Sequence, residues 1–497
     1  SSINESSHLN TPFNEADPNV TVNNEKAIMW FRQDFRLKDN PALNDASKSK
    51  EVIPVYIYDT NNAGNYQLGS ASRWWLHKSL QSLNQSINNS LVVLSGDPKV
   101  LLKELVHTSG ADKVVWNRNY EPWQISRDKL IKSNLEGNGT KVRTYNGGLL
   151  WEPHKILNSS GQPYKVFTPF YRNGCLNSPA PRIPSTRAKK CTFRYLEKMD
   201  QGIDSLGLKP QINWHIKISK SWEPGEDSAI RKLKKFLRNS VSNYNSGRDI
   251  PGKEGTSKLS PHLRFGEISP NQIWYASTKK IKEKVSVPDL ECFLSQIGWR
   301  EFSYYLLYHF PNIPEKNFNQ RFDNYRWETE GPKLKAWQRG LTGVPIVDAG
   351  MRELWETGHM HNRVRMIVGS YLVKNLNIDW REGGAWFWDC LLDADLASNS
   401  ASWQWVSGSG ADASPFFRIF NPVIQGEKFD KDGIYVRKYC PEINKLPNQY
   451  IHKPWEAPEP MLHEYGIELG KNYPRPLVNL KESRSEALDK YRELSSN

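Results

Sequence analysis

Residues 379–430, DWREGGAWFWDCLLDADLASNSASWQWVSGSGADASPFFRIFNPVIQGEKFD, combine residue types that rarely occur together. The stretch holds five tryptophans and many Gly and Ser residues beside Asp393, Asp395 and Asn399. A single buried Trp usually serves packing, because aromatic side chains contribute much of the apolar area of protein cores. Together, the rings, carboxylates and small residues predict more than a core helix, namely a site for a flat group that accepts electrons.

The whole chain is long and basic. Its 497 residues exceed what one hydrophobic core usually serves, which predicts about two or three domains. Lys and Arg number 67 against 54 Asp and Glu, and the net charge of +13 favours a polyanionic partner, most simply nucleic acid.

The five cysteines form no C-x-x-C pair, so we expect neither a zinc ribbon nor a disulfide framework, and a reducing compartment fits best. No apolar run of about 18 residues occurs, so we expect neither a membrane span nor a secretory peptide.

The first part of the chain has the pattern of an α/β domain. Residues 1–25 are polar and lack apolar periodicity, which predicts a disordered leader. From Lys26, apolar β-branched runs such as EVIPVYIYD and LVVLSGD alternate with helical patterns, which predicts a Rossmann-like parallel sheet over residues 26–150. Ligands of such sheets bind beyond the carboxyl ends of the strands, so the loops 30–40, 59–69 and 117–121 could hold a small cofactor.

The second part of the chain has a helical pattern. Residues 151–223 contain frequent Pro, Gly and Ser and have weak periodicity, which predicts a connector. Residues 224–497 run from EDSAIRKLKKFLRNSVSNY through DAGMRELWETGHMHNRVRMIVGSYLVKNL without long strand runs. We therefore expect an α/β N-terminal domain, the connector and an all-α C-terminal domain.

Several motifs resemble those of the photolyase/cryptochrome family. They are N-x-x-x-W-Q-W at residues 399–405, G-x-G-x-D-A-x-P-x-F-R-I-F-N-P at residues 408–422 and Q-G-E-K-F-D at residues 425–430. Within the family, the chain looks most like a class I-type cyclobutane pyrimidine dimer (CPD) DNA photolyase. The resemblance implies that the helical domain binds FAD, and that excited, reduced FAD donates an electron to a cis-syn dimer in UV-damaged DNA.

The resemblance also implies a flavin site with a phosphate seat and a ring pocket. Small hydroxyl residues beside backbone N–H groups at a helix start favour anions, although such a tract alone is more often a plain N-cap. The implied cofactor-binding residues are Tyr244, Arg248, Thr256, Ser257, Lys258, Leu259, Ser260, Arg300, Asn362, Arg365, Asp393, Asp395 and Asn399. The alternative for Arg300, Asn362 and Arg365 is a set of interhelical salt bridges. No His or third carboxylate flanks the two aspartates at ligand spacing, so we expect no metal.

Four of the implied catalytic residues concern electron transfer. Asn399 matches the position whose amide faces flavin N5, where it can donate or accept a hydrogen bond and so tunes the redox state. Photolyases of this type carry asparagine there, whereas plant cryptochromes typically carry aspartate. Trp403, Trp380 and Trp327 match the family's electron-transfer chain, with Trp403 nearest the flavin and Trp327 toward the surface, and core packing is the alternative for each ring.

The lesion site follows from the same resemblance. The implied substrate-binding residues are Arg248, Gln296, Trp299, Asn362, Arg363, Met366, Trp405 and Arg418. A flipped base dimer needs flat apolar walls, which Trp299 and Trp405 would provide. Gln296 departs from the glutamate that many CPD enzymes place three residues before the pocket Trp, and it puts the efficiency of dimer splitting in doubt. Because Gln also occurs there in (6-4) enzymes, a (6-4) photolyase is one alternative, and a blue-light photoreceptor (cryptochrome) is another.

The remaining expectations concern partners. DNA phosphates would be contacted by basic residues around the pocket, with Arg363, Lys428 and Arg437 as candidates, and this binding would weaken with salt. An antenna cofactor, 5,10-methenyltetrahydrofolate in preference to deazaflavin, would contact Asn117, Asn119 and Glu121. We expect a monomer in the cytoplasm, associated with the nucleoid in a bacterium, or in the nucleus or an organelle of a eukaryote.

Overall fold

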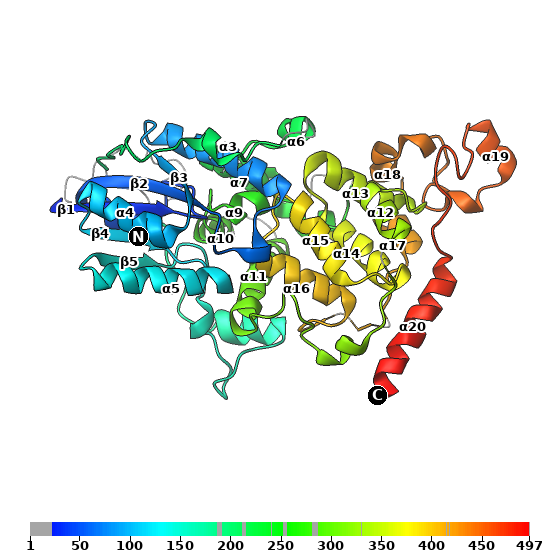
Figure 1. Cartoon of the computed structure of the whole chain (residues 1–497). Helices are drawn as coiled ribbons and strands as arrows, with labels where there is room; N and C mark the ends of the chain where they lie inside the picture. The colour runs from blue at the N-terminus through cyan, green and yellow to red at the C-terminus, as the bar shows by residue number, and fades with distance from the viewer. Residues whose placement is uncertain are drawn as a thin grey trace. The chain divides into compact units, whose positions relative to one another are not determined.

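The computed structural model describes residues 22–185, 191–210, 215–239, 241–251, 256–280, 287–329, 331–413, 415–416 and 418–496. The chain forms two compact units, and Figure 1 labels the strands and most of the helices. The sheet unit comprises residues 1–213, 222–242 and 257–311, and the helical unit comprises residues 214–221, 243–256 and 312–497.

A five-stranded parallel sheet forms the centre of the sheet unit. The strands are β1 (Asn23–Phe31), β2 (Ser49–Asp59), β3 (Val92–Gly96), β4 (Lys113–Asn117) and β5 (Lys141–Tyr145), in the order β3-β2-β1-β4-β5. Ile28, Ile53, Val92 and Val114 lie in the core of this sheet, as expected for parallel strands that are covered on both faces. The structure confirms the predicted Rossmann-like α/β class.

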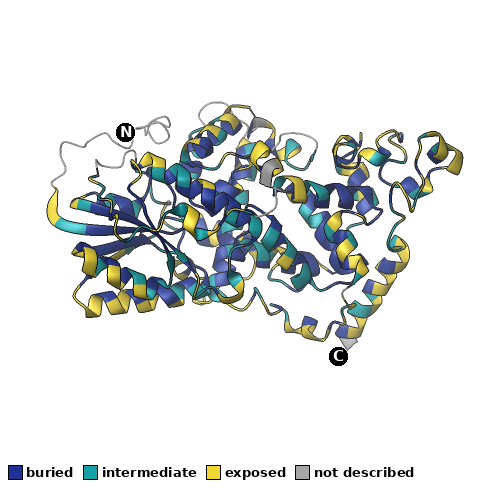
Figure 2. Ribbon diagram, turned by 45° about the horizontal axis from the view of Figure 1, so that its top comes forward, coloured by how far each residue is buried: buried dark blue, intermediate teal, exposed yellow. Residues whose placement is uncertain are grey.

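Helices connect successive strands, namely α2 (Pro41–Ala46), α3 (Ser70–Ser86), α4 (Pro98–Ser109) and α5 (Pro122–Gly137). The sequence marks both ends of α4: the side chain of Asp97 accepts a hydrogen bond from the Lys99 N–H, and Pro98 occupies the first turn. Gly110 ends the helix with φ of 70°, a conformation that glycine adopts without strain. Figure 2 shows the strands buried and the outer helix faces exposed.

The strand order reverses beside β1, because β2 and β3 lie on one side of it and β4 and β5 on the other. In open α/β sheets, ligands bind at such a reversal. The loops after β1 and β4 meet there, since Arg32 Nη2 donates to Asn117 O at 2.7 Å.

The sheet unit also contains η2 (Pro153–Lys155), η3 (Pro169–Cys175), η4 (Ile203–Leu206), α7 (Glu226–Asn239), α9 (Ser260–Arg264), α10 (Pro270–Lys279) and α11 (Val287–His309). Buried Glu267 ties this region to α3, because its carboxylate accepts from Trp75 Nε1 at 3.2 Å, Ser79 Oγ at 2.6 Å and Gly225 N at 2.9 Å. Helices α7, α9, α10 and α11 therefore group with the sheet, and the compact units do not follow the predicted division at residue 224.

The helical unit is built from α6 (His215–Ser221), α8 (Tyr244–Gly247), α12 (Pro332–Arg339), α13 (Pro345–Thr357), α14 (Asn362–Ser370), α15 (Trp380–Cys390), α16 (Leu396–Ser407), α17 (Pro422–Phe429), α18 (Ile434–Tyr439), α19 (Glu459–Glu464) and α20 (Leu480–Ser496). Shorter turns are η7 (Gln320–Asn324), η8 (Tyr371–Asn375), η9 (Pro441–Ile443) and η10 (Pro454–Glu456), while η5 (Val241–Asn243) lies where the units divide. The predominance of helix in this unit confirms the all-α expectation for the C-terminal region.

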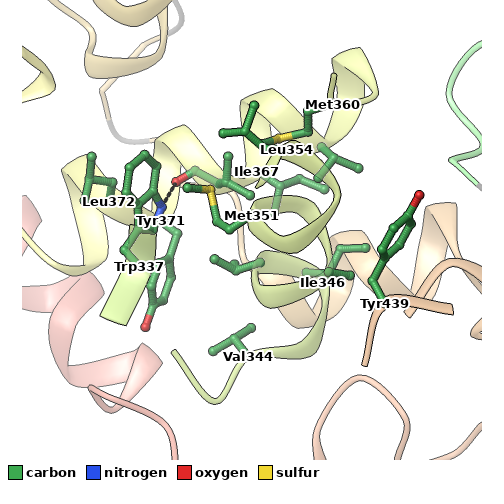
Figure 3. Packing of buried hydrophobic residues seen from close by; sticks show 14 of the residues in the cluster. Trp337, Val344, Ile346, Met351, Leu354, Met360, Ile367, Tyr371, Leu372 and Tyr439 are labelled. Carbon is green, nitrogen blue, oxygen red and sulfur yellow. Dashed lines mark hydrogen bonds between the residues drawn. The ribbon is translucent and has the colours of Figure 1, made fainter. Parts of the chain in front are cut away.

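Buried side chains of α12, α13 and α14 form the centre of the helical unit (Figure 3). Trp337 is fully buried, and its Nε1 donates to Val368 O at 3.1 Å, which satisfies the only polar atom of the ring. Asp348 of α13 is also buried and accepts from Thr342 Oγ1 at 2.7 Å, Gly343 N at 3.0 Å and the Tyr473 hydroxyl at 2.5 Å. These bonds join the start of α13 to a segment more than a hundred residues later.

The N-terminal boundary differs from the prediction. Strand β1 begins at Asn23 rather than Lys26, because Asn23 N donates to Lys48 O at 2.8 Å and Glu25 pairs with Lys141 at 2.6 Å. The rest of the predicted leader, residues 1–21, lies outside the described residues. Among the helices of the described chain, none is long and apolar enough to cross a membrane.

Candidate functional site

The segment between α15 and α16 carries two aspartates with different partners. Arg365 of α14 forms a bidentate ion pair with Asp393, with Nη1–Oδ1 at 3.1 Å and Nη2–Oδ2 at 2.8 Å. Asp395 caps α16 by accepting from Ser398 N at 2.7 Å. The pair fixes the arginine head, and the cap fixes the first turn of the helix that carries Asn399 and Trp403.

Asn399 is anchored across two helices. Its Nδ2 donates to Gly384 O of α15 at 3.0 Å. One N–H of the amide and its carbonyl oxygen have no other partner in the described part of the chain. The amide is thus oriented by the protein and can still exchange a hydrogen bond with a ligand.

Trp403 lies in the core of the same region. It is buried, and its ring packs at 4.9 Å from Phe387 and 6.1 Å from Trp337. A Cβ on Gly383 would lie 2.1 Å from the Trp403 ring, so only glycine fits there. The Trp403 Nε1 is buried and has no hydrogen-bond partner, which costs free energy unless a bound group accepts from it.

The other two rings of the predicted electron-transfer chain also lie in the helical unit. Trp380 is buried at the start of α15, and its Nε1 donates to Asn317 Oδ1 at 2.9 Å. Trp327 is half-buried and lies 4.4 Å from the ring of Tyr325. The decrease in burial from Trp403 and Trp380 to Trp327 fits a surface end at Trp327.

The start of α14 presents several predicted contacts. Asn362 is exposed, and the helix is capped by His361, whose Nδ1 accepts from Arg363 N at 3.1 Å. Burial lowers the pKa of His361 to about 4, which favours the neutral form as required of an acceptor. The Arg363 guanidinium lies 3.2 Å from Asp249 and 4.4 Å from the Phe429 ring. It is therefore held between a carboxylate and an aromatic face.

The predicted phosphate seat divides between the units. Tyr244 and Arg248 belong to the helical unit with Thr256, whereas residues 257–260 belong to the sheet unit. The Arg248 Nε is buried without a hydrogen-bond partner. In the sheet unit, Lys258 has φ of 53°, and Leu259, the N-cap of α9, makes no side-chain cap bond. The start of α9 thus lacks the plain side-chain N-cap that was the alternative interpretation.

Trp299 and Gln296 lie on α11 of the sheet unit, and both are half-buried. The Trp299 ring stacks on Phe167 at 3.9 Å with an interplanar angle of 13°, and Phe167 stacks on Tyr171 at 5.4 Å. One face of Trp299 is therefore fixed by the connector. Gln296 is three residues earlier, on the same side of the helix.

Arg300 makes its hydrogen bonds to described residues within the sheet unit, and its implied contact with the flavin stays a prediction. It donates to Glu301 Oε2 at 3.1 Å and to Gly148 O at 3.0 Å. Its side chain lines a cavity inside the sheet unit, beside Tyr304. These contacts hold the Arg300 side chain toward the loop after β5.

That cavity lies at the reversal of the strand order. Its lining includes Gln33, Arg36, Arg118, Asn119, Tyr120, Glu121, Gly147, Gly148, Arg264 and Arg300. Two of the three predicted antenna contacts, Asn119 and Glu121, line it. Asn117 does not, because it is buried and its Nδ2 donates to Asp34 Oδ2 at 2.6 Å and Asn40 Oδ1 at 2.8 Å, while Ala42 N donates to its Oδ1 at 3.1 Å.

The other residues predicted to contact the lesion or the DNA differ in their burial and in their partners within the protein. Met366 and Trp405 are half-buried and pack against the helical core. Arg418 and Lys428 are exposed. Arg437 is engaged, because its Nε donates to Asn444 O at 3.0 Å and its Nη2 donates to Leu446 O at 2.6 Å. The predicted role of Arg437 in DNA binding therefore has less support from geometry than that of Arg418 or Lys428.

Known families match both parts of the chain. Residues 27–186 match the model of the DNA photolyase family, and residues 293–493 match the FAD binding domain of DNA photolyase. This chain belongs to the photolyase/cryptochrome family. Its C-terminal region is thus an FAD-binding domain, and the buried, unpartnered Arg248 Nε and Trp403 Nε1 fit a cofactor with acceptor atoms.

Relatives include both photolyases and cryptochromes. The chain is 48% identical over 477 residues to a deoxyribodipyrimidine photo-lyase of Agrobacterium fabrum, covering 95% of this chain and 98% of the relative. It is 36% identical over 487 residues to Cryptochrome-2 of Arabidopsis thaliana, covering 94% of this chain and 79% of the relative. The structure of a bacterial class III photolyase from Agrobacterium tumefaciens aligns with a TM-score of 0.92 at 47% identity, covering 97% of this chain and all of that one. Class III is therefore a better comparison than the class I type named from the motifs.

Sequence reasoning missed three supporting residues: Gly383, Asp249 and Phe167. A signal existed for Gly383, because two adjacent glycines inside a helical pattern indicate close packing. The pairing of Asp249 with Arg363 and of Phe167 with Trp299 had no signal in one sequence, since these partners are more than a hundred residues apart.

Proposed function

We propose that this chain is a deoxyribodipyrimidine photo-lyase that repairs cis-syn cyclobutane pyrimidine dimers in DNA under blue light. The main support for this proposal is the position and the hydrogen bonding of Asn399. Its amide is held by Gly384 O at 3.0 Å and stands one helical turn before Trp403 in an FAD-binding domain. A neutral amide in this place suits a repair enzyme, and several relatives of the chain are named deoxyribodipyrimidine photo-lyase.

The helical unit would hold the cofactor through three side chains. Arg365, fixed by Asp393, brings positive charge to the ring pocket. Asn399 offers its free amide atoms, and Arg248 offers its unpartnered Nε to a phosphate. When bound, FAD supplies the transfer of one electron to the dimer after excitation and its return after the ring bonds break. The protein's part is to orient the cofactor and to keep water away from it.

Three tryptophans would carry electrons to the flavin site from the surface. Trp403 and Trp380 are buried, whereas Trp327 is half-buried. Solvent access lets a reductant reach Trp327, and burial protects the inner rings.

Each unit contains flat rings and polar groups of the kind that would bind a lesion. In the sheet unit, Trp299 has one face fixed by Phe167, and Gln296 stands one turn before it. In the helical unit, Trp405, Met366 and the exposed amide of Asn362 are available. Arg363, Arg418 and Lys428 would contact phosphates, which hold the strand without reading its sequence.

We also propose that the cavity of the sheet unit holds the antenna. Asn119 and Glu121 supply polar contacts there, and Arg36 and Arg118 supply cations. This composition suits an anionic pterin such as 5,10-methenyltetrahydrofolate, with deazaflavin as the alternative. The absorption spectrum of the purified protein distinguishes the two, and Asn119→Ala should release the antenna while FAD is retained.

The decisive experiment uses photoreduced protein and an oligonucleotide with a single cis-syn thymine dimer. Blue light should restore intact thymines, measured by chromatography, and a dark sample should not. Absence of repair would exclude the proposal. Repair of only a (6-4) lesion would show that the chain is a (6-4) photolyase instead. The expected monomer is tested separately by light scattering, which should give the mass of one chain.

A photoreceptor of the cryptochrome kind is the second candidate, favoured by the likeness to Arabidopsis Cryptochrome-2 over most of the chain. The same assay separates it from a photolyase, because a receptor would photoreduce its flavin without restoring thymines.

A further inference from the structure

Lys374 is a buried lysine that forms no ion pair with any residue the structure describes. It lies in η8, directly after α14, and is 1% exposed. Among the described residues its Nζ has one hydrogen-bond partner, Arg418 O at 3.3 Å, and it lies 5.2 Å from the centre of the Phe416 ring. Burying an ammonium without a carboxylate is costly, and burial lowers the pKa of Lys374 to about 8.

Lys113 of the sheet unit provides a contrast. It is also 1% exposed, but its Nζ lies 2.8 Å from Asp45 and 3.6 Å from Glu25. The charge of Lys113 is thus compensated within the fold. Within the described part of the chain, the ammonium of Lys374 contacts a main-chain carbonyl and an aromatic ring.

The carbonyl belongs to the loop of residues 408–421, which joins α16 to α17. At its start, Ser409 Oγ donates to Gln404 Oε1 at 3.3 Å. At its end, Asn421 caps α17. In the middle, the Phe416 ring stacks on Tyr491 of α20 at 4.6 Å. Lys374 therefore adds a polar anchor to the middle of the loop, at Arg418 itself.

Arg418 points its side chain outward from this anchor. The side chain is exposed, and no described residue accepts a hydrogen bond from its guanidinium. Its own N–H donates to Pro415 O at 2.9 Å. The main chain at Arg418 is thus held on both sides, by Pro415 and by Lys374, while the guanidinium stays available.

We propose that Lys374 is a positioning residue that holds Arg418 in place to contact a phosphate of the damaged DNA strand. The inference rests on the proposed function and adds to it the residue that orients this contact. In a medium of low dielectric constant, an ammonium–carbonyl bond is stronger than in water. It can therefore fix the main chain of the loop at Arg418.

The test uses the full chain loaded with FAD and measures binding to a dimer-containing oligonucleotide in the dark, by fluorescence anisotropy. Arg418→Ala should weaken binding about tenfold and should reduce the slope of log K against log salt by about 0.9, the value for one lost phosphate contact. Lys374→Met, which keeps the length of the side chain, should weaken binding to a similar extent and should reduce the slope of log K against log salt by a similar amount. The double variant should show no further change, because both substitutions remove the same contact.

Lys113→Met is the matched control. It removes a buried lysine far along the chain from the loop, so it should lower the melting temperature and leave the salt slope unchanged. Hydrogen exchange of residues 411–421 should increase in Lys374→Met and not in Lys113→Met. If Lys374→Met does not fold, Lys374→Gln, which retains an N–H donor without the charge, is measured instead and should give a smaller loss.

Two results would overturn the inference. In the first, Lys374→Met loses stability but keeps the wild-type affinity and slope, so that its role is only structural. In the second, Arg418→Ala binds DNA as the wild type does. Light-driven repair by the wild-type protein is measured on the same preparation, so a failure of the proposed function is distinguished from a failure of the Lys374 assignment.

Discussion

Arg365 and Asp393 face each other in a two-fold hydrogen-bonded ion pair, with N–O distances of 3.1 and 2.8 Å. The pair joins α14 to the start of the segment that leads into α16. Arg365 Nε also donates to Met360 O at 2.7 Å. The arginine is therefore fixed at three points, and the charge that we assign to the flavin pocket has a defined place.

Replacement of Asp393 by Asn should loosen this arrangement. Breaking a fully buried pair costs roughly 3–5 kcal/mol, and we expect less because the Arg365 side chain is 23% exposed. Urea unfolding should show a loss of about 2 kcal/mol in the free energy of unfolding, and FAD should be released more readily. Glu493→Gln, in the exposed pair with Arg326, is the control and should change stability by less than about 1 kcal/mol. Equal effects of the two variants would contradict the role of the pair.

Gly383 and Gly384 offer a test of packing around Trp403. A Cβ at Gly383 would lie 2.1 Å from the ring, whereas the nearest atom to a Cβ at Gly384 is 3.7 Å away. Gly383→Ala should destabilise the protein by about 1–3 kcal/mol and slow flavin photoreduction, because the ring must move. Gly384→Ala should be tolerated or stabilising by up to about 1 kcal/mol, since alanine favours helix. Thermal unfolding and the rate of photoreduction measure both effects.

The fold was largely predictable from local patterns, and the site only in part. Apolar β-branched runs at regular spacing are sufficient to predict the parallel sheet, because period and turn residues are local properties. Arg300 shows what local patterns omit: its partner, Gly148 O, is 152 residues earlier in the chain. The same holds for Asn117, whose amide is engaged by Asp34 and Asn40. Such contacts depend on how distant loops meet, which one sequence does not specify.

Trp327→Phe should separate photoreduction from repair. The substitution keeps most of the apolar volume, so stability should fall by no more than about 1.5 kcal/mol. Photoreduction of oxidised FAD should slow greatly, because the half-buried end of the tryptophan chain is removed. Repair by chemically reduced enzyme should persist. Trp355→Phe, at an exposed ring outside the proposed chain, is the control, and unchanged photoreduction in Trp327→Phe would indicate another route.

Glu301 should make stability depend on pH. It is buried and accepts from Leu150 N at 2.6 Å and Trp151 N at 3.0 Å. Burial raises the pKa of Glu301 to about 7 from its ordinary value of 4.5. Between these values the folded state keeps a proton that the unfolded state has lost, so stability falls as pH rises through this window, by up to about 3 kcal/mol.

Glu301→Gln removes this titration and leaves an oxygen that accepts from both N–H groups. From pH 5 to pH 7.5, the free energy of unfolding of the wild type should therefore fall relative to that of the variant. Urea unfolding of both proteins measures this change. A difference that does not change with pH would show that Glu301 has the same pKa in both states. The comparison of the two proteins cancels the contribution of Glu226, whose pKa burial also raises to about 7.

Gln296 bears on which lesion the enzyme accepts, because it stands one turn before Trp299 and is half-buried. Its amide can donate directly to a thymine carbonyl, whereas a carboxylate must first be protonated. Gln296→Glu should leave FAD binding intact and change the affinity for a cis-syn dimer by less than about tenfold, or 1.4 kcal/mol. The repair quantum yield should rise or stay level, and its pH dependence should change. Loss of dimer binding with intact FAD would show that the amide is an indispensable donor, and it would reopen the choice of lesion.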